Sequence, residues 1–520
     1  MNRRSILVLS VCALALAQPP AAAPAKKPKL VLAIVVDQFR ADYLYRFGAE
    51  YNSGLKRLWT QGAVFTNAHH EHYPTVTAIG HSTFLTGATP SLSGIVGNEW
   101  YDRGTGKQVT SVSDGNTKLL GGEGAGSSPR RLLVSTVVDE MKMSGRTPVK
   151  AIGVSIKDRS AILPIGHMGD GAYWFDNKSG NMVSSTYYFS QMPEWAQAFN
   201  RKRMADQWVN AEWKPLLEPA AKPFVKMEAK LEEKYWAGMQ RTPYGNELLE
   251  AFAEQAVIGE KLGQTPGATD VLALSLSSND YVGHEVGPDS PRVRDISIRT
   301  DRLLGKLFQF LDAKVGMQNV LIAFTADHGV SPIPELMKER KMPGGRLVDD
   351  DVFGKVTARL VDRYGAGDWI QGRSGSAAYL NHGLIRGKRL NLAAIRREAA
   401  EVLRSQPHIF RVYTQDQMVE GLTIDDAVDR RVRNGYYAGR SADLLVIPEP
   451  YYIFDKTGTT HGTPFNYDSH VPVILAGPGI KPGKYHRRVM VNDIAPTLAT
   501  LLEVETPSGA MGRVLDEALR

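Results

Sequence analysis

The chain has 520 residues, of which 43% are hydrophobic and 22% are charged, and its formal net charge is +7. These values are ordinary for a globular protein and exclude a chain that is disordered over long stretches. Basic residues form no run long enough to indicate nucleic-acid binding, and no segment after the N-terminus is apolar for long enough to span a membrane. The length favours one large domain that carries insertions.

The N-terminus predicts a secretory signal peptide over residues 1–23. Arg3 and Arg4 are followed by a short apolar run at residues 6–16 and then by small residues that suit a signal peptidase. We therefore expect export to the periplasm or beyond the cell, with residues 24–520 as the mature protein and a net charge that falls by two, to +5. The single cysteine, Cys12, lies inside this signal, so the mature chain cannot form disulfides. A lipoprotein anchored through Cys12 is a weaker alternative, because the apolar run before it is very short.

Continuous apolar runs rich in β-branched residues predict buried strands, at residues 30–36, 149–156, 271–276 and 320–325, with further candidates at 444–447 and 471–475. Helical patterns lie between them, at about residues 41–61, 131–144, 296–315 and 493–502. This alternation predicts an α/β fold with a doubly wound, mostly parallel sheet. Ligands of such sheets bind beyond the carboxyl ends of the strands.

Residues from about 166 to 245 interrupt this alternation. Five of the eight tryptophans lie here, at positions 174, 195, 208, 213 and 236. We interpret the segment as an insertion packed by its own aromatic side chains. A second interpretation, compatible with the first, is a cap over an active site.

Acidic residues and histidines gather at the predicted strand ends. Asp37 ends the first strand, Asp327 and His328 follow another, and Asp280 and His284 are spaced to share one face of a helical turn. His461 lies in a loop. Each residue alone is ordinary for a turn, a cap or a loop. In combination, carboxylate oxygens and imidazole nitrogens are a ligand set that suits zinc.

Thr77 is the candidate nucleophile. It lies at a turn before a helical stretch, where unpaired amides favour an anion. A plain helix cap would give the same local pattern. A functional threonine needs activation, which a metal ion supplies. Thr75 is its rival within the same motif.

These residues together resemble the alkaline phosphatase superfamily, and within it the bacterial phosphate-irrepressible, monoesterase-type alkaline phosphatases with a threonine nucleophile. The resemblance runs from about residue 30 to about 502, and the nucleotide pyrophosphatases/phosphodiesterases share the core. It implies two zinc ions per chain, one held by Asp37, Thr77, Asp327 and His328 and one by Asp280, His284 and His461. It also implies that Thr77 is the nucleophile and that the phosphoryl group is bound by Asn98, Lys157 and Arg159.

The implied activity is the hydrolysis of small-molecule phosphate monoesters through a phosphorylated Thr77. A lysine and an arginine suit the dianion of a monoester, although alone the Lys157–Arg159 segment is typical of an exposed turn. Two alternatives remain: a phosphodiesterase or nucleotide pyrophosphatase with the same metals, and an exported phosphate- or metal-binding protein without turnover. The nearby histidines are expected to pack in the core or to support the ligands, at positions 69, 70, 72, 81 and 470.

Overall fold

The computed structural model describes residues 27–421 and 426–520. The predicted signal peptide and Cys12 lie outside these described residues. Within the described ranges, no helix combines the length and the apolar character that a membrane crossing requires.

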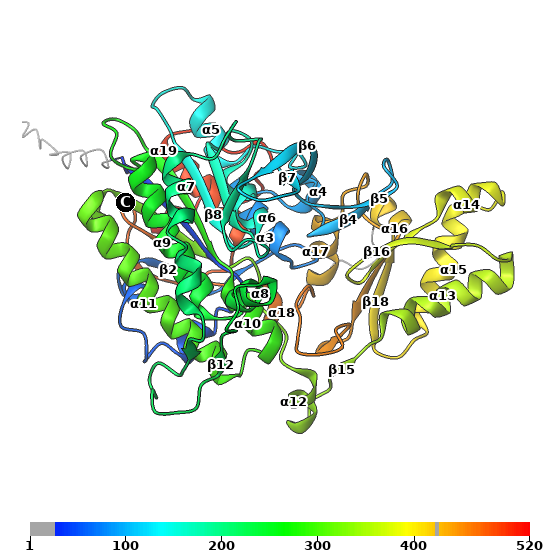
Figure 1. The fold of residues 1–520 in the computed structure, drawn as a ribbon. Coiled ribbons are helices and arrows are strands. Elements are labelled where there is room, and N and C mark those ends of the chain that lie inside the picture. Colours follow the sequence, from blue (N-terminus) through cyan, green and yellow to red (C-terminus); the bar gives the residue numbers. More distant parts are fainter. Residues whose placement is uncertain (1–26, 422–425) are drawn as a thin grey trace, which may run out of the picture.

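An 11-stranded sheet forms the main body (Figure 1). Its centre is five consecutive parallel strands, β14 (Val320–Thr325), β1 (Leu30–Val36), β13 (Asp270–Leu276), β8 (Ala151–Ser155) and β9 (Gly171–Phe175). Every residue of these five strands is buried, which explains why their sequences are continuous apolar runs and do not alternate. Four of the five are the strands that the sequence predicts at 30–36, 149–156, 271–276 and 320–325, so the α/β fold class is confirmed.

Both edges of the sheet are mixed. At one edge β21 (Val473–Ala476) runs antiparallel to β14, and β2 (Ala63–Phe65) and β22 (Gly483–Tyr485) follow it. At the other edge β10 (Met182–Ser185), β6 (Ser113–Leu120) and β7 (Ala125–Ser127) are antiparallel to their neighbours. Antiparallel strands therefore flank the parallel centre on both sides. One of them, β21, is the strand expected at 471–475.

Helices cover both faces because the chain winds in two directions. Helix α6 (Asp158–Ile162) connects β8 to β9, whereas α10 (Ser278–Val286) and α11 (Pro291–Lys314) connect β13 to β14 in the opposite direction. Crossovers of one hand in opposite directions place their helices on opposite faces. Helix α9 (Pro243–Glu260) packs with α11, and α3 (Thr77–Thr86) and α19 (Ile494–Leu502) pack on the α6 side.

Three predicted helices differ in their bounds, and the one expected at 296–315 is α11, which begins earlier, at Pro291. The stretch expected at 41–61 forms two helices, α1 (Tyr43–Arg46) and α2 (Gly54–Gln61). The second begins afresh because the buried Asp301 carboxylate accepts hydrogen bonds from the backbone N–H groups of Ser53 and Lys56. The stretch expected at 131–144 is shortened to α5 (Val137–Met143), which starts at a capping box on Thr136.

The aromatic-rich segment at 166–245 begins inside the main sheet, as β9 and β10, and continues through α7 (Glu194–Arg201) and α8 (Glu233–Gln240). Its rings pack on one another and on α9. Trp195 lies 5.2 Å from the Tyr173 ring and 5.1 Å from that of Phe252, measured between ring centroids. Trp208 stacks on Tyr244 at 5.2 Å. The aromatic residues of the segment therefore pack both on one another and on Phe252, which lies beyond the segment.

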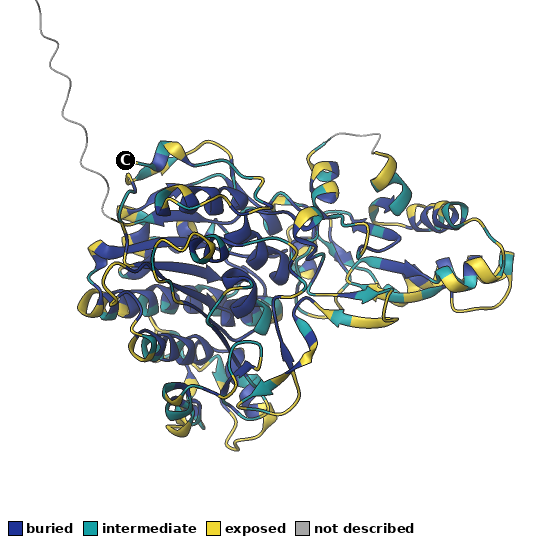
Figure 2. Ribbon diagram, turned by 90° about the horizontal axis from the view of Figure 1, so that it is seen from above, coloured by how far each residue is buried: buried dark blue, intermediate teal, exposed yellow. Residues whose placement is uncertain are grey.

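A second lobe projects from the main body, at the right of Figure 1. It contains a four-stranded sheet in the order β16 (Ile370–Ser374), β17 (Ala377–Leu380), β19 (Leu444–Pro448) and β18 (Ile409–Thr414). Helices α13 (Asp349–Tyr364) and α15 (Leu392–Arg404) cover it and share a separate apolar core. Figure 2 shows the lobe's helices with large exposed stretches, in contrast to the buried strands of the main body. The strand expected at 444–447 forms, as β19, but belongs to this lobe.

Gly153 in β8 should be sensitive to a single added methyl group. A Cβ atom there would lie 2.0 Å from the backbone oxygen of Ala161 in α6, so strand and helix would have to separate. We expect Gly153→Ala to lower the free energy of unfolding by about 1–3 kcal/mol in urea denaturation. Gly115 in β6 is the matched control, because a methyl group added there would meet nothing within 4 Å. Equal effects of the two substitutions would contradict this packing.

Candidate metal centre and active site

The predicted site residues converge at the carboxyl ends of four neighbouring strands. Asp327 follows β14, Asp37 follows β1, Asp280 lies in α10 just after β13, and Lys157 lies two residues beyond β8. Parallel strands all end at one edge of the sheet, so residues that are distant in sequence meet there.

One ligand group surrounds Thr77. Asp37, Asp327 and His328 are buried, and His328 Nε2 lies 3.2 Å from Asp327 Oδ2 and 3.4 Å from the Thr77 hydroxyl. The Oδ2 atoms of Asp37 and Asp327 are buried and accept no hydrogen bond from the residues that the structure describes, although the Lys157 ammonium lies 3.0 Å from Asp37 Oδ2. Buried carboxylate oxygens that accept no hydrogen bond favour nearby cations, and Lys157 supplies one such charge to Asp37.

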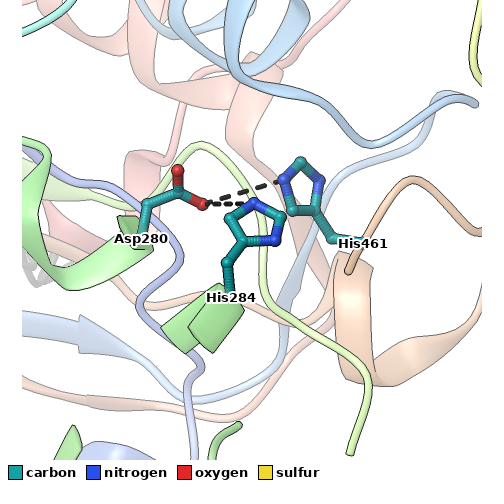
Figure 3. Close-up of side chains that lie close together, drawn as sticks. All are labelled: Asp280, His284 and His461. Carbon is teal, nitrogen blue, oxygen red and sulfur yellow. Dashed lines mark ion pairs between the residues drawn. The ribbon is translucent and has the colours of Figure 1, made fainter. Parts of the chain in front are cut away.

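The second group is Asp280, His284 and His461, whose candidate ligand atoms all lie within 4.8 Å of one another (Figure 3). Asp280 Oδ1 is 3.2 Å from His284 Nε2 and 3.7 Å from His461 Nε2. Asp280 and His284 are four residues apart on α10, as the predicted helical turn requires. The ring centroids of His461 and His328 are 3.4 Å apart, so the two groups adjoin.

Backbone carbonyl groups orient all three histidines in the same way. The Nδ1 atom of His284 is 2.8 Å from Thr459 O, that of His328 is 2.9 Å from Gly329 O, and that of His461 is 2.7 Å from a carbonyl in the Thr77 segment. Because Nδ1 donates to a carbonyl, the Nε2 lone pair of each ring points toward the centre. This is the usual outer support of a metal-ligating histidine.

The charges in the site are strongly coupled. Burial alone would raise the pKa of Asp327, but the neighbouring His328 ring holds it below its ordinary value. Burial would lower the pKa of His328, but Asp327 raises it to about 9. Burial and the adjacent His328 and His284 rings lower the pKa of His461, which favours the neutral form that a metal ligand requires.

Lys157 lies between the two ligand groups. Its ammonium is 2.6 Å from Asp280 Oδ2 and 3.0 Å from Asp37 Oδ2. Burial would lower its pKa, but these two carboxylates raise it above the ordinary value of lysine. The same ammonium, together with His284, holds the pKa of Asp280 well below its usual range against the effect of burial.

Thr77 occupies the first position of α3 and is buried. The helix can approach the β14 end so closely because residue 80 is glycine: a Cβ atom there would lie 2.2 Å from the Asp327 backbone oxygen. The hydroxyl thus lies at the N-terminus of a helix and also beside a candidate ligand group.

Asn98 and Arg159 face the same space from either side. Asn98 Oδ1 accepts a hydrogen bond of 2.8 Å from the backbone N–H of Ala78, which leaves its NH₂ group as a donor. Both residues line a cavity of about 590 Å³ together with His284 and His461. The opposite wall of this cavity comes from the second lobe, and within the described part of the chain no residue of the 166–245 segment lines it.

Two contributors to the site had no specific role assigned from the sequence. His81 Nδ1 and Nε2 lie 3.5 Å from Asp327 Oδ2 and Asp37 Oδ1. Its spacing of four residues from Thr77 on a predicted helix was the available signal. Gln38 adopts a left-handed conformation with φ 60°, and it donates from its backbone N–H to Asp327 Oδ1 and from its amide to Asp280 Oδ1. No sequence pattern marks that conformation in a glutamine.

The residues present fit divalent metal ions. Asp280, His284 and His461 form one group of candidate ligands, and Asp37, His81 and Asp327 form another, which lies beside His328 and Thr77. The rings of His284, His328 and His461 present Nε2 toward these groups. Such mixed oxygen and nitrogen sets are the ligands that zinc takes in open catalytic sites.

Comparison with known proteins identifies the family of this chain. Residues 31–470 match the model of the type I phosphodiesterase/nucleotide pyrophosphatase family. Alkaline phosphatase PafA of Elizabethkingia meningoseptica is 37% identical over 98% of both chains. Alkaline phosphatase PhoV of Synechococcus elongatus is 37% identical over 95% of this chain and 93% of its own.

Comparison with solved structures gives the same relatives. The crystal structure of wild-type alkaline phosphatase PafA superposes with a TM-score of 0.89, at 36% identity, over 95% of this chain and 99% of that one. A PafA variant substituted at a threonine, an asparagine, a lysine and an arginine superposes with a TM-score of 0.90. The chain therefore belongs to the type I phosphodiesterase/nucleotide pyrophosphatase family, and within it is an alkaline phosphatase.

Proposed function

We propose that this protein is an exported, two-zinc phosphatase that hydrolyses small-molecule phosphate monoesters through a phosphorylated Thr77. The observation that carries the proposal is the position of the Thr77 hydroxyl. It lies at a helix N-terminus, 3.4 Å from His328 Nε2, beside three buried carboxylates and three oriented imidazoles. Export rests on the signal pattern in residues 1–23.

In the proposed site Asp37, Thr77, Asp327 and His328 hold one ion, and Asp280, His284 and His461 hold the other. When bound, zinc would lower the pKa of a coordinated hydroxyl and stabilise negative charge on the attacking and leaving oxygens.

The chain's own residues account for the remaining steps. Thr77 Oγ loses its proton to solvent and attacks phosphorus, the bond to the ester oxygen breaks, and the leaving oxygen takes a proton from water and departs as the alcohol. Water then hydrolyses the phosphothreonine ester, which regenerates Thr77 and releases inorganic phosphate. The free NH₂ of Asn98 and the Arg159 guanidinium take charge from the non-bridging oxygens.

The PafA variant supports this residue set. Its four substituted residues match Thr77, Asn98, Lys157 and Arg159 in type and order, and the spacings within the first pair and within the last pair are the same. The family also contains phosphodiesterases, which is the principal alternative. Arg159 favours the monoester, because a dianion offers the guanidinium a third non-bridging oxygen.

Thr77→Ala should lower kcat/KM for 4-nitrophenyl phosphate by about 1,000-fold or more, because the covalent route is lost. Zinc content should stay nearly intact, since the carboxylates and imidazoles remain. In acid-quenched wild-type enzyme, peptide mass spectrometry should locate phosphate on Thr77, and Thr77→Ser should restore part of the rate. Phosphate on Thr75, or a fully active and zinc-loaded alanine variant, would refute this mechanism.

Arg159→Ala should reduce kcat/KM for 4-nitrophenyl phosphate far more than for bis(4-nitrophenyl) phosphate, by about ten-fold or more in the ratio. Arg159 is the cleaner probe of the pair, because Lys157 also contacts Asp37 and Asp280. Lys157→Ala should therefore alter zinc affinity as well. Equal losses of kcat/KM on both substrates in Arg159→Ala would mean that Arg159 does not recognise the monoester dianion.

Asp280→Asn and Asp327→Asn should each lower the zinc content by about one ion per chain, measured by elemental analysis after gel filtration. Each removes a carboxylate from a different ligand group. Asp362→Asn, an exposed position on α13, is the control and should keep the wild-type content. Chelation should abolish phosphate release and added zinc should restore it. A wild-type protein that retains no zinc while fully active would contradict the proposal.

A further inference from the structure

The cavity beside the site is much larger than a phosphoryl group requires. Its volume of about 590 Å³ lies within the range of small-molecule pockets. Asn98, Arg159, His284 and His461 mark its phosphoryl end. The remaining space, which we call the leaving-group chamber, is where the alcohol portion of a monoester would lie.

Aromatic and aliphatic side chains from both parts of the protein form the chamber walls. Tyr73 comes from the main body, and Tyr379, Tyr452 and Phe454 come from the second lobe region. The walls are fixed relative to one another, because the Tyr73 hydroxyl lies 2.6 Å from Ser376 Oγ and donates to the Val446 carbonyl at 3.0 Å. Rigid apolar walls suit a leaving group with an aromatic or aliphatic body.

The charges along the chamber have one sign. Apart from Arg159 at the phosphoryl end, the fully charged lining residues are all acidic, namely Glu99, Asp158, Asp349 and Asp455. Asp158 lies beside Arg159, with 3.9 Å between its Oδ1 and the guanidinium. The other three carboxylates have no ion-pair partner among the residues that the structure describes.

Asp349 has no ion pair within the described residues, although burial raises its pKa and the nearby Arg373 and Lys456 charges oppose that rise. Its Oδ1 atom is buried and lacks a hydrogen bond to any described residue. The neighbouring Arg373 guanidinium pairs instead with Asp350, at 2.8 Å. The chamber thus presents a carboxyl group whose Oδ1 atom has no hydrogen-bond partner among the described residues.

We propose that the leaving-group chamber selects phosphate monoesters whose leaving group is neutral or cationic and has an aromatic or aliphatic body, and discriminates against leaving groups that carry further negative charge. The proposal rests on the proposed function. An added negative charge about 8 Å from each carboxylate, at an intermediate dielectric constant, would lower kcat/KM by about five-fold per carboxylate. A nucleoside monophosphate, which releases a neutral nucleoside, fits the chamber, whereas the terminal phosphate of a nucleoside triphosphate leaves a polyanion.

The test compares ratios, so that the intrinsic reactivity of each substrate cancels. Initial phosphate release is measured with AMP, ATP and phosphocholine, on the wild type and on Glu99→Gln/Asp349→Asn/Asp455→Asn. The ratio of kcat/KM for ATP to that for AMP should rise by about ten-fold or more in the variant, and the ratio for phosphocholine to AMP should fall. The matched control, Glu123→Gln/Glu232→Gln/Asp362→Asn, removes three exposed carboxylates that do not line the chamber and should leave both ratios unchanged.

Asp455→Asn alone provides a second variant, because Asp455 is exposed and its loss should not impair folding. It should raise the ATP-to-AMP ratio by about five-fold. Unchanged ratios in this variant and in the triple variant, with AMP still hydrolysed, would overturn the proposed selection by charge. Absence of phosphate release from all three substrates would instead contradict the proposed function.

Discussion

The site depends on the burial of three carboxylates at one edge of a parallel sheet. Asp37, Asp280 and Asp327 follow three adjacent strands and are almost completely shielded from water. Three like charges in such a place are stable only beside cations. Lys157 supplies one positive charge, and the raised pKa of His328 shows that the pocket also favours a proton. The same demand for positive charge favours divalent metal ions, which would replace that proton.

The fold places the nucleophile where this charge can act on it. Helix α3 begins at Thr77 and approaches the end of β14 over Gly80, so the hydroxyl lies at a helix N-terminus beside His328. The carbonyl that orients His461 belongs to the residue two positions before Thr77. The nucleophile segment therefore also supports a ligand of the second group, which ties the geometry of the hydroxyl to that of both candidate metal sites.

The sequence predicted the parallel centre, and it placed most residues of the candidate site near strand ends, because both follow from local patterns. Continuous apolar runs located four central strands, and each polar residue of interest stands directly after one or in a recognisable turn. The second lobe was not recognised as a separate unit. Its strand β19 was predicted, but only as a further strand of the same series, and β16 and β18 are half-exposed and lack such runs. Gln38 was missed because its role depends on a left-handed backbone that glutamine seldom adopts. The cavity wall formed by Tyr379 and Tyr452 depends on tertiary contacts alone.

The second lobe contributes one wall of the cavity that opens from the candidate phosphoryl site. Everything proposed for the site requires two metal ions bound beside Thr77. Zinc-edge anomalous diffraction from crystals of the protein tests this requirement most directly. We predict two anomalous peaks about 4 Å apart, one within about 2.2 Å of Asp327 and His328 and one equally close to His284 and His461. Peaks elsewhere on the protein, with none between these side chains, would contradict the account.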